Sequence, residues 1–201
     1  MFARRLCLTL ALLAAPPAAL AVDAAQVPAK KHTQAGLYLT AGEVPGFIRE
    51  QGGAERVLFL DVRSGAEALF VGLPTAVDAL VPLVEVRTGL ADWDAKAGSF
   101  KVEPLPDFEA RVRARLQAKG LKADAPVILI CRSGERSARA ADRLSAAGFT
   151  RVLSVVDGFE GDTAPDGRRS VNGWKNSGQP WGYQLRPGQV VLDAGAVRPG
   201  H

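Results

Sequence analysis

The chain has 201 residues, of which 47% are hydrophobic, a size suited to one ordinary domain with extensions and too small for two full domains. Its formal net charge is +4. The basic residues are scattered and interleaved with acidic ones, and no platform of aromatic residues accompanies them. The composition therefore argues against a nucleic-acid partner.

The first 21 residues resemble an export signal. Arg4 and Arg5 form a basic start, residues 6–13 are apolar, and residues 19–21 read Ala-Leu-Ala, a typical cleavage site. The apolar stretch is well below the ~20 residues that a membrane span needs. We expect residues 1–21 to be removed as a signal peptide. The mature protein is then expected to be periplasmic or secreted, with no attachment to the membrane.

The next part of the chain is predicted to form a flexible lead-in, a helix and a strand. Residues 22–36 mix Ala, Pro and Lys without periodicity, which predicts the lead-in. Thr40 and Glu43 have the spacing of a capping box, which predicts a short helix that ends near Gly52. The continuous apolar run 57–60 predicts a strand buried on both faces and ending before Asp61.

Residues 72–106 are rich in Gly and Pro and hold only short apolar runs. This pattern predicts a long loop with room for one strand. A loop of that length is more irregular chain than a compact domain usually keeps without a purpose. The sequence does not indicate the role of residues 72–106.

Alternating helices and strands are predicted after this loop. Asp107 is placed to cap a helix that runs to Ala118, with Gly120 following it. Strands are predicted at 127–130 and 152–156, with a helix at 137–147 between them. The order implies an α/β fold: a single doubly wound domain with a central parallel sheet flanked by helices. We place the domain at 37–185 and a C-terminal tail at 186–201.

Cys131 is the candidate catalytic residue, since the other cysteine, Cys7, lies in the expected signal peptide. It directly follows the apolar run 127–130, and ligands of open α/β sheets bind beyond the carboxyl ends of the strands. A lone thiol in an oxidising compartment is exposed to damage unless it is sheltered or used. A buried cysteine that only packs as a small hydrophobe is the alternative interpretation.

The residues after Cys131 form a short loop between a strand and the start of a helix. They are Arg132, Ser133, Gly134, Glu135, Arg136 and Ser137. Such a turn collects backbone N–H groups that favour negative charge at its centre. With Arg132 and Arg136 nearby, this loop should stabilise the nucleophilic thiolate of Cys131. Ser137 is also placed to act as the N-cap of the helix.

Three segments resemble motifs of the rhodanese family of sulfurtransferases. They are the loop 131–137 (C-R-S-G-E-R-S), the segment Asp61-Val62-Arg63 with Glu67 (D-V-R-x-x-x-E), and the segment 174–180 (W-x-x-x-G-x-P). The resemblance extends over about residues 37–185. It implies a rhodanese-like α/β fold and transfer of a sulfane sulfur from a donor such as thiosulfate, through a Cys131 persulfide, to cyanide or a thiol.

The resemblance also implies roles for individual residues. Cys131 would be the nucleophile, and residues 132–137 would hold the anionic donor and the persulfide. Asp61 and Arg63 would be supporting residues that link the end of the first buried strand to the site. No cofactor is implied, and His32, His201 and Cys131 lack the spacing of metal ligands, so no metal site is expected.

Two other functions stay open. The chain has no second cysteine after signal removal, so it cannot resolve its own persulfide and needs an outside acceptor, which leaves room for a non-catalytic carrier serving a protein acceptor. A cysteine phosphatase is less favoured, because its arginine stands six positions after the cysteine, where this chain has Ser137. The expected partners are thus a small anionic sulfur donor and a thiol or cyanide acceptor.

Overall fold

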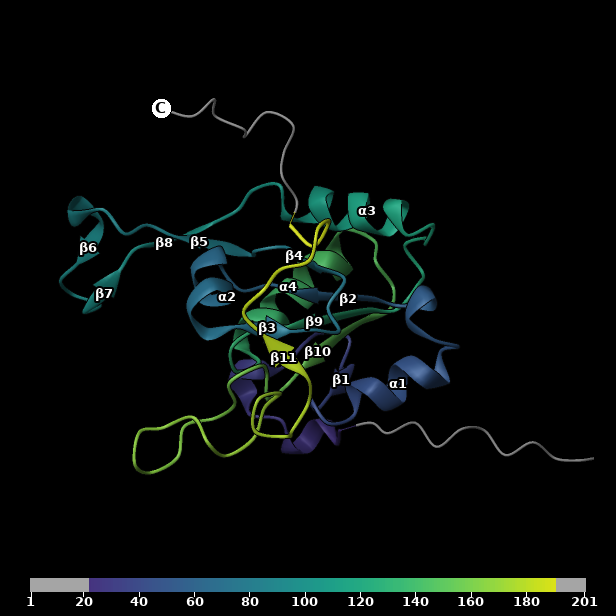
Figure 1. Cartoon of the computed structure of the whole chain (residues 1–201), viewed down its shortest axis with the longest axis horizontal. Helices are drawn as coiled ribbons and strands as arrows, with labels where there is room; N and C mark the ends of the chain where they lie inside the picture. Colours follow the sequence, from purple (N-terminus) through teal and green to yellow (C-terminus); the bar gives the residue numbers. More distant parts are fainter. Residues whose placement is uncertain (1–21, 191–201) are drawn as a thin grey trace, which may run out of the picture.

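The computed structural model describes residues 22–190, which form an α/β domain around a five-stranded sheet (Figure 1). The strand order is β1-β10-β9-β2-β4, and every neighbouring pair is parallel. The strands are β1 (Tyr38–Leu39), β2 (Leu58–Asp61), β4 (Ala79–Leu80), β9 (Val127–Ile130) and β10 (Val152–Val155). The predicted fold class, a parallel sheet flanked by helices, is confirmed.

Within residues 22–190, four α-helices accompany the sheet: α1 (Val44–Glu50), α2 (Gly65–Val71), α3 (Phe108–Ala118) and α4 (Glu135–Ala146). Successive side chains of a strand point to opposite faces, so Leu58 and Leu60 pack with α3 and α4 while Phe59 packs with α1 and with Trp174 of the C-terminal segment. Both faces of the central strands are therefore covered, which explains their uninterrupted apolar sequences. Among residues 22–190, no helix is long and apolar enough to cross a membrane.

The segment 22–36 differs from the flexible lead-in that its composition predicts. It contains two short 3-10 helices, η1 (Ala24–Gln26) and η2 (Ala29–Lys31). Lys31 is 2% exposed and forms an ion pair of 2.7 Å with Asp162. The backbone N–H of Gln34 donates to Asp142 on α4. The segment is thus packed against the helix that follows Cys131, through polar contacts that periodicity does not reveal.

The prediction of an irregular loop at 72–106 was wrong. The segment contains β3 (Leu73–Pro74), β4, β5 (Val84–Val86), the 3-10 helix η4 (Leu90–Asp92), β6 (Trp93–Asp94), β7 (Ser99–Phe100) and β8 (Val102–Pro104). The antiparallel pairs β5–β8 and β6–β7 form a projection, here called the hairpin arm (residues 84–104), which extends away from the sheet in Figure 1. Because its strands have only two or three residues each, the alternation is too short to stand out in the sequence.

The C-terminal part of the described chain returns to the domain. β11 (Trp181–Gly182) pairs antiparallel with β3. Gln189 is buried, and its carbonyl accepts a hydrogen bond of 2.8 Å from the backbone N–H of Leu80 at the edge of the sheet. The expected signal peptide and residues 191–201 of the expected tail lie outside the described residues.

Candidate active site

The ends of β2 and β9 bring two of the sequence motifs together. Asp61 pairs in register with Ile130, so residues 61–63 leave the sheet beside Cys131. Parallel neighbours end at the same edge of the sheet, which is where α/β domains bind ligands. The loop 131–137 and the segment that starts at Asp61 therefore meet at this edge.

Gly134 makes the turn from β9 into α4 possible. Its φ is 97°, a left-handed conformation that favours glycine. A Cβ at this position would lie 2.1 Å from the carbonyl oxygen of Val156, so a side chain cannot be accommodated without displacing backbone. Gly134 is the N-cap residue of α4, and the helix begins at Glu135. The predicted N-cap role of Ser137 was therefore wrong.

The sulfur of Cys131 faces backbone donors. Its Sγ accepts a hydrogen bond of 3.2 Å from the N–H of Gly134. The N–H groups of Glu135 and Arg136 are the first of α4 and have no carbonyl acceptor within the helix. The carbonyl of Cys131 itself is directed elsewhere, since it accepts a bond of 2.7 Å from the N–H of Phe159. The donor-rich end of the helix thus favours negative charge on the sulfur.

Ser137 lies in the first turn of α4 and joins a buried hydroxyl pair. Its Oγ donates to the carbonyl of Gly134 at 3.0 Å and lies 2.9 Å from the Oγ of Ser154 on β10. The thiol of Cys131 is 3.5 Å from the same Ser137 oxygen. Ser154 is fully buried and was not among the predicted site residues. The only signal for it in the sequence is a serine inside an otherwise apolar strand.

Arg136 is paired with Glu67 from α2. The guanidinium contacts both carboxylate oxygens, at 2.6 and 2.5 Å, which is the bidentate geometry of strong ion pairs. Glu67 also accepts hydrogen bonds of 3.0 Å from the backbone N–H and the hydroxyl of Ser64. Burial raises the pKa of Glu67, but the bonds and charge of Arg136, together with the Ser64 bonds, lower it to about 2. The glutamate of the second motif therefore belongs to the site.

Asp61 and Arg63 form a fully buried ion pair with a shortest contact of 2.6 Å. Arg63 also donates to the carbonyl of Gly72 at 2.7 Å, and its guanidinium lies 4.1 Å from the ring centre of Phe159. Neither charged side chain lines the pocket described next. Through these contacts, the Asp61–Arg63 ion pair links the end of β2 to the start of the 72–106 segment and to the chain after β10.

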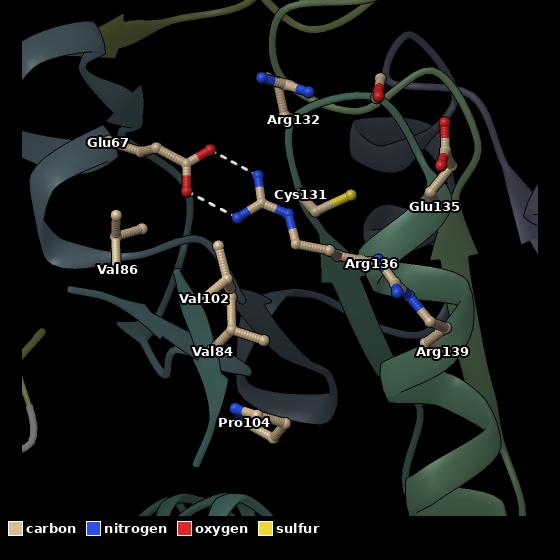
Figure 2. Close-up of a pocket in the computed structure, with 11 residues that line it drawn as sticks. Glu67, Val84, Val86, Val102, Pro104, Cys131, Arg132, Glu135, Arg136 and Arg139 are labelled. Carbon is tan, nitrogen blue, oxygen red and sulfur yellow. Dashed lines mark hydrogen bonds and ion pairs between the residues drawn. The ribbon is translucent and has the colours of Figure 1, made fainter. Parts of the chain in front are cut away.

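Cys131 lies in a pocket of about 590 Å³ (Figure 2). Although Cys131 is only 1% exposed, it forms part of the pocket wall. The other lining residues are Glu67, Val84, Val86, Val102, Pro104, Arg132, Ser133, Glu135, Arg136 and Arg139. The predicted residues Arg132, Ser133, Glu135 and Arg136 are thus brought together with the thiol, whereas Gly134 and Ser137 contact the sulfur from within the loop and helix. The contributions of the hairpin arm and of Arg139 were not predicted.

No group of three or more His, Cys, Asp or Glu side chains within residues 22–190 is placed to hold a metal ion. The ring nitrogen Nε2 of His32 lies 2.7 Å from the carbonyl oxygen of Val27, on the segment before η2.

Fold and site define an α/β domain with a cysteine in the loop between a parallel strand and a helix N-terminus. The family model for the Rhodanese-like domain matches residues 46–164, more than half of the chain. The protein therefore belongs to the rhodanese family, of which sulfur transfer is the characteristic activity.

Known proteins resemble this chain over different extents. The uncharacterized protein RP600 of Rickettsia prowazekii is 34% identical over 62 residues, which are 31% of this chain and 46% of that protein, so the chain spans about half the length of the curated relatives it matches. The crystal structure of Rv0390 from M. tuberculosis is 29% identical, covers 73% of this chain and 97% of its own, and superposes with a TM-score of 0.53. The superposition on Rv0390 agrees with the assignment of a rhodanese fold.

Proposed function

We propose that this protein is a sulfurtransferase that accepts a sulfane sulfur from a donor such as thiosulfate on Cys131 and passes it to cyanide or a thiol. One observation carries the proposal: the Sγ of Cys131 accepts the N–H of Gly134 at the N-terminus of α4, inside a pocket lined by arginines. These groups favour both an anionic nucleophile and an anionic substrate.

In the first step, the Cys131 thiolate attacks the outer sulfur of thiosulfate. A sulfur–sulfur bond forms to Cys131, the original sulfur–sulfur bond breaks, and its electron pair leaves with sulfite. The product on the protein is the persulfide anion, so the total charge does not change. We propose that the N–H of Gly134, which contacts the Cys131 sulfur, and the free N–H groups of Glu135 and Arg136 in the first turn of α4 stabilise the terminal sulfur.

In the second step, cyanide or a thiolate attacks the terminal sulfur of the persulfide. The new bond forms to the acceptor, and the electron pair of the broken bond returns to Cys131 as thiolate. The hydroxyl of Ser137 lies 3.5 Å from the sulfur and donates its one hydrogen to the carbonyl of Gly134. By turning, it can donate that hydrogen to the thiolate instead, while Ser154 donates to the Ser137 oxygen. We propose this pair as support for the anionic sulfur.

A carrier that delivers sulfur only to a docked protein remains the second candidate. It rests on Cys131 being the one free cysteine among residues 22–190, so that within this range no second thiol can take the sulfur from the persulfide. A cysteine phosphatase is not supported, because the sixth position after the cysteine is the buried Ser137 and Arg136 is engaged with Glu67.

We also propose that residues 1–21 direct export of the protein. N-terminal sequencing of the protein recovered from the periplasm would check this.

Mass spectrometry of the intact protein after incubation with thiosulfate tests the central proposal. The wild type is expected to gain one sulfur atom, which cyanide then removes as thiocyanate. Cys131→Ser should gain none while keeping its fold, because serine fills the site but forms no persulfide. Sulfur uptake by the serine variant would refute the assignment. Uptake by the wild type without release to cyanide or to small thiols would favour the carrier.

A further inference from the structure

Lys31, from the segment before β1, packs against the turn between Cys131 and α4. The residue is 2% exposed, and a Cβ on Gly134 would lie 3.0 Å from its Cδ. The aliphatic part of the lysine side chain therefore lies directly against Gly134. Gly134 is the residue whose N–H donates to the Sγ of Cys131 at 3.2 Å. A side chain from the segment 22–36 thus supports the backbone donor of the reactive sulfur.

A second stretch of chain, directly after β10, contacts the beginning of the same loop. The carbonyl of Arg132 accepts hydrogen bonds from the N–H groups of Glu160 and Gly161, at 2.9 and 3.3 Å. Gly158 has a φ of 64°, and a Cβ there would lie 2.5 Å from the backbone nitrogen of Ser133. This stretch therefore packs closely on the loop that carries the cysteine.

An ion pair joins these two supports of the loop. The ammonium of Lys31 lies 2.7 Å from a carboxylate oxygen of Asp162. Asn172 accepts the backbone N–H of Asp162 at 2.8 Å and donates to its carboxylate at 3.1 Å. Burial raises the pKa of Asp162, but the bonds to Lys31 and Asn172 and the charge of Lys31 lower it below its ordinary value. The carboxylate is therefore charged at neutral pH, and we call the Lys31–Asp162 ion pair the clasp.

The segment that carries Lys31 is also fixed to α4. The N–H of Gln34 donates to Asp142 at 2.8 Å, and Lys30 pairs with Glu135 at 2.7 Å. The family match begins at residue 46, so this segment precedes it. Because an ammonium is costly to remove from water, a buried ion pair contributes little net stability but can fix geometry. The clasp is therefore better suited to hold the loop than to stabilise the fold.

We propose that Lys31 is a positioning residue for sulfur transfer, which through the clasp keeps the N–H of Gly134 directed at the sulfur of Cys131. This inference rests on the proposed function. Lys31 does not line the pocket, so it acts through the loop and not on the donor or the acceptor. Without the clasp, the N–H of Gly134 is free to turn away, and the thiolate and the persulfide anion both lose stabilisation.

Lys31→Met in the full chain tests the clasp, because methionine keeps an aliphatic side chain against Gly134 but cannot pair with Asp162. Single-turnover kinetics should show a rate constant of persulfide formation at saturating thiosulfate that is about tenfold lower than in the wild type. The thiosulfate concentration for half the maximal rate should change little, because the arginines of the pocket are untouched. An unchanged rate constant overturns the inference.

Lys119→Met is the matched control. Lys119 is 13% exposed, pairs with Asp78 at 2.6 Å and donates to the carbonyl of Val57. Val57 precedes β2, whereas Cys131 follows the parallel strand β9, so the control lies at the opposite edge of the sheet. Both substitutions should lower the free energy of unfolding in urea, because each leaves a carboxylate unpaired. Only Lys31→Met should slow persulfide formation, and equal losses of rate in the two variants overturn the positioning role.

Asp162→Ala breaks the clasp from its other end and serves also if Lys31→Met does not fold. It should slow persulfide formation, and an unchanged rate constant overturns the clasp. The double variant Lys31→Met/Asp162→Ala should be no slower than the slower single variant, because both changes remove the same ion pair. Losses that multiply in the double variant show that the two residues act separately and overturn the clasp.

Hydrogen exchange separates the clasp from the chemistry. Mass spectrometry of the peptide that contains residues 131–137 should show faster amide exchange in Lys31→Met than in the wild type, and no change in Lys119→Met. Should the wild type take up no sulfur while this difference persists, the proposed function fails and the clasp stands as a support of the loop. Unchanged exchange in Lys31→Met, with sulfur transfer by the wild type intact, overturns the clasp alone.

Discussion

Replacement of Glu67 by glutamine isolates the ion pair that holds Arg136 in the candidate active site. The two side chains are 20% and 17% exposed, and the carboxylate contacts the guanidinium of Arg136 with both oxygens. Glutamine keeps the shape but removes the charge, and its amide N–H₂ group must face a cation. We therefore expect Glu67→Gln to destabilise the fold at neutral pH, because Arg136 remains partly buried without its counter-ion.

The magnitude follows from the pKa of Glu67, which falls from 4.5 to about 2 in the folded protein. A difference of about 2.5 between two pKa values, at ~1.36 kcal/mol each, corresponds to about 3 kcal/mol of stability. Since the folded pKa is depressed, this contribution is fully present above about pH 4.5 and is lost as the pH falls through about 2. The difference between wild type and Glu67→Gln should therefore be largest near pH 7 and shrink below pH 4.5.

Urea denaturation followed by circular dichroism at pH 7, 5 and 3 measures this difference. Glu135→Gln is the control, because its ion pair with Lys30 is 41% and 64% exposed and such pairs contribute less than ~1 kcal/mol. A loss at pH 7 no greater than that of the control would refute the reasoning. So would a loss for Glu67→Gln that is the same at pH 3 as at pH 7, because the effect would then not depend on the charge of the carboxylate.

Two further substitutions test the site. Arg136→Ala should lower kcat/KM for the sulfur donor by about ten- to hundredfold, because a charge-assisted contact is lost and Glu67 is left unpaired in the pocket. Adding Glu67→Gln to this variant should recover part of the loss. Equal kcat/KM values for the single and the double variant would contradict this prediction. Gly134→Ala should destabilise the fold by more than Gly98→Ala, for which ~1 kcal/mol is expected. Both glycines have a left-handed conformation, but a Cβ at Gly98 would meet no atom within 4 Å, whereas a Cβ at Gly134 would meet the carbonyl of Val156. Equal unfolding free energies in chemical denaturation would show that the close approach is unimportant.

The central strands could be predicted from the sequence because burial leaves a direct mark on it. The runs 57–60, 127–130 and 152–156 are continuous or nearly so in apolar residues, as expected where both faces of a parallel sheet are covered. The outer strands β1 and β4 have two residues each and carry no such pattern. The hairpin arm escaped prediction for the same reason, since its pairing depends on register across a turn and not on a long local alternation.

The loop around Cys131 could likewise be found, because nucleophile, glycine and helix start are adjacent in the chain. The residues from other elements that contact this loop could not be predicted from the sequence. Glu67 is 69 residues from Arg136, and Ser154 is 17 residues from Ser137, so only the fold brings each pair together. The sequence motif that contains Glu67 indicated a relationship between proteins, and the structure shows what its glutamate does: it makes a bidentate contact to Arg136, which lines the candidate site.

The hairpin arm bears on whether Cys131 serves small molecules or a protein. The thiol is 1% exposed and is reached through a pocket that the arm closes on one side. A small donor or acceptor can enter a pocket of about 590 Å³ with the arm in place. A cysteine on a folded partner brings its own backbone, so the arm restricts its approach more than that of a small molecule. Shelter of this kind protects a reactive thiol from oxidation while leaving it open to small substrates. The position of the arm therefore favours a free-standing sulfurtransferase over a carrier that docks a protein acceptor.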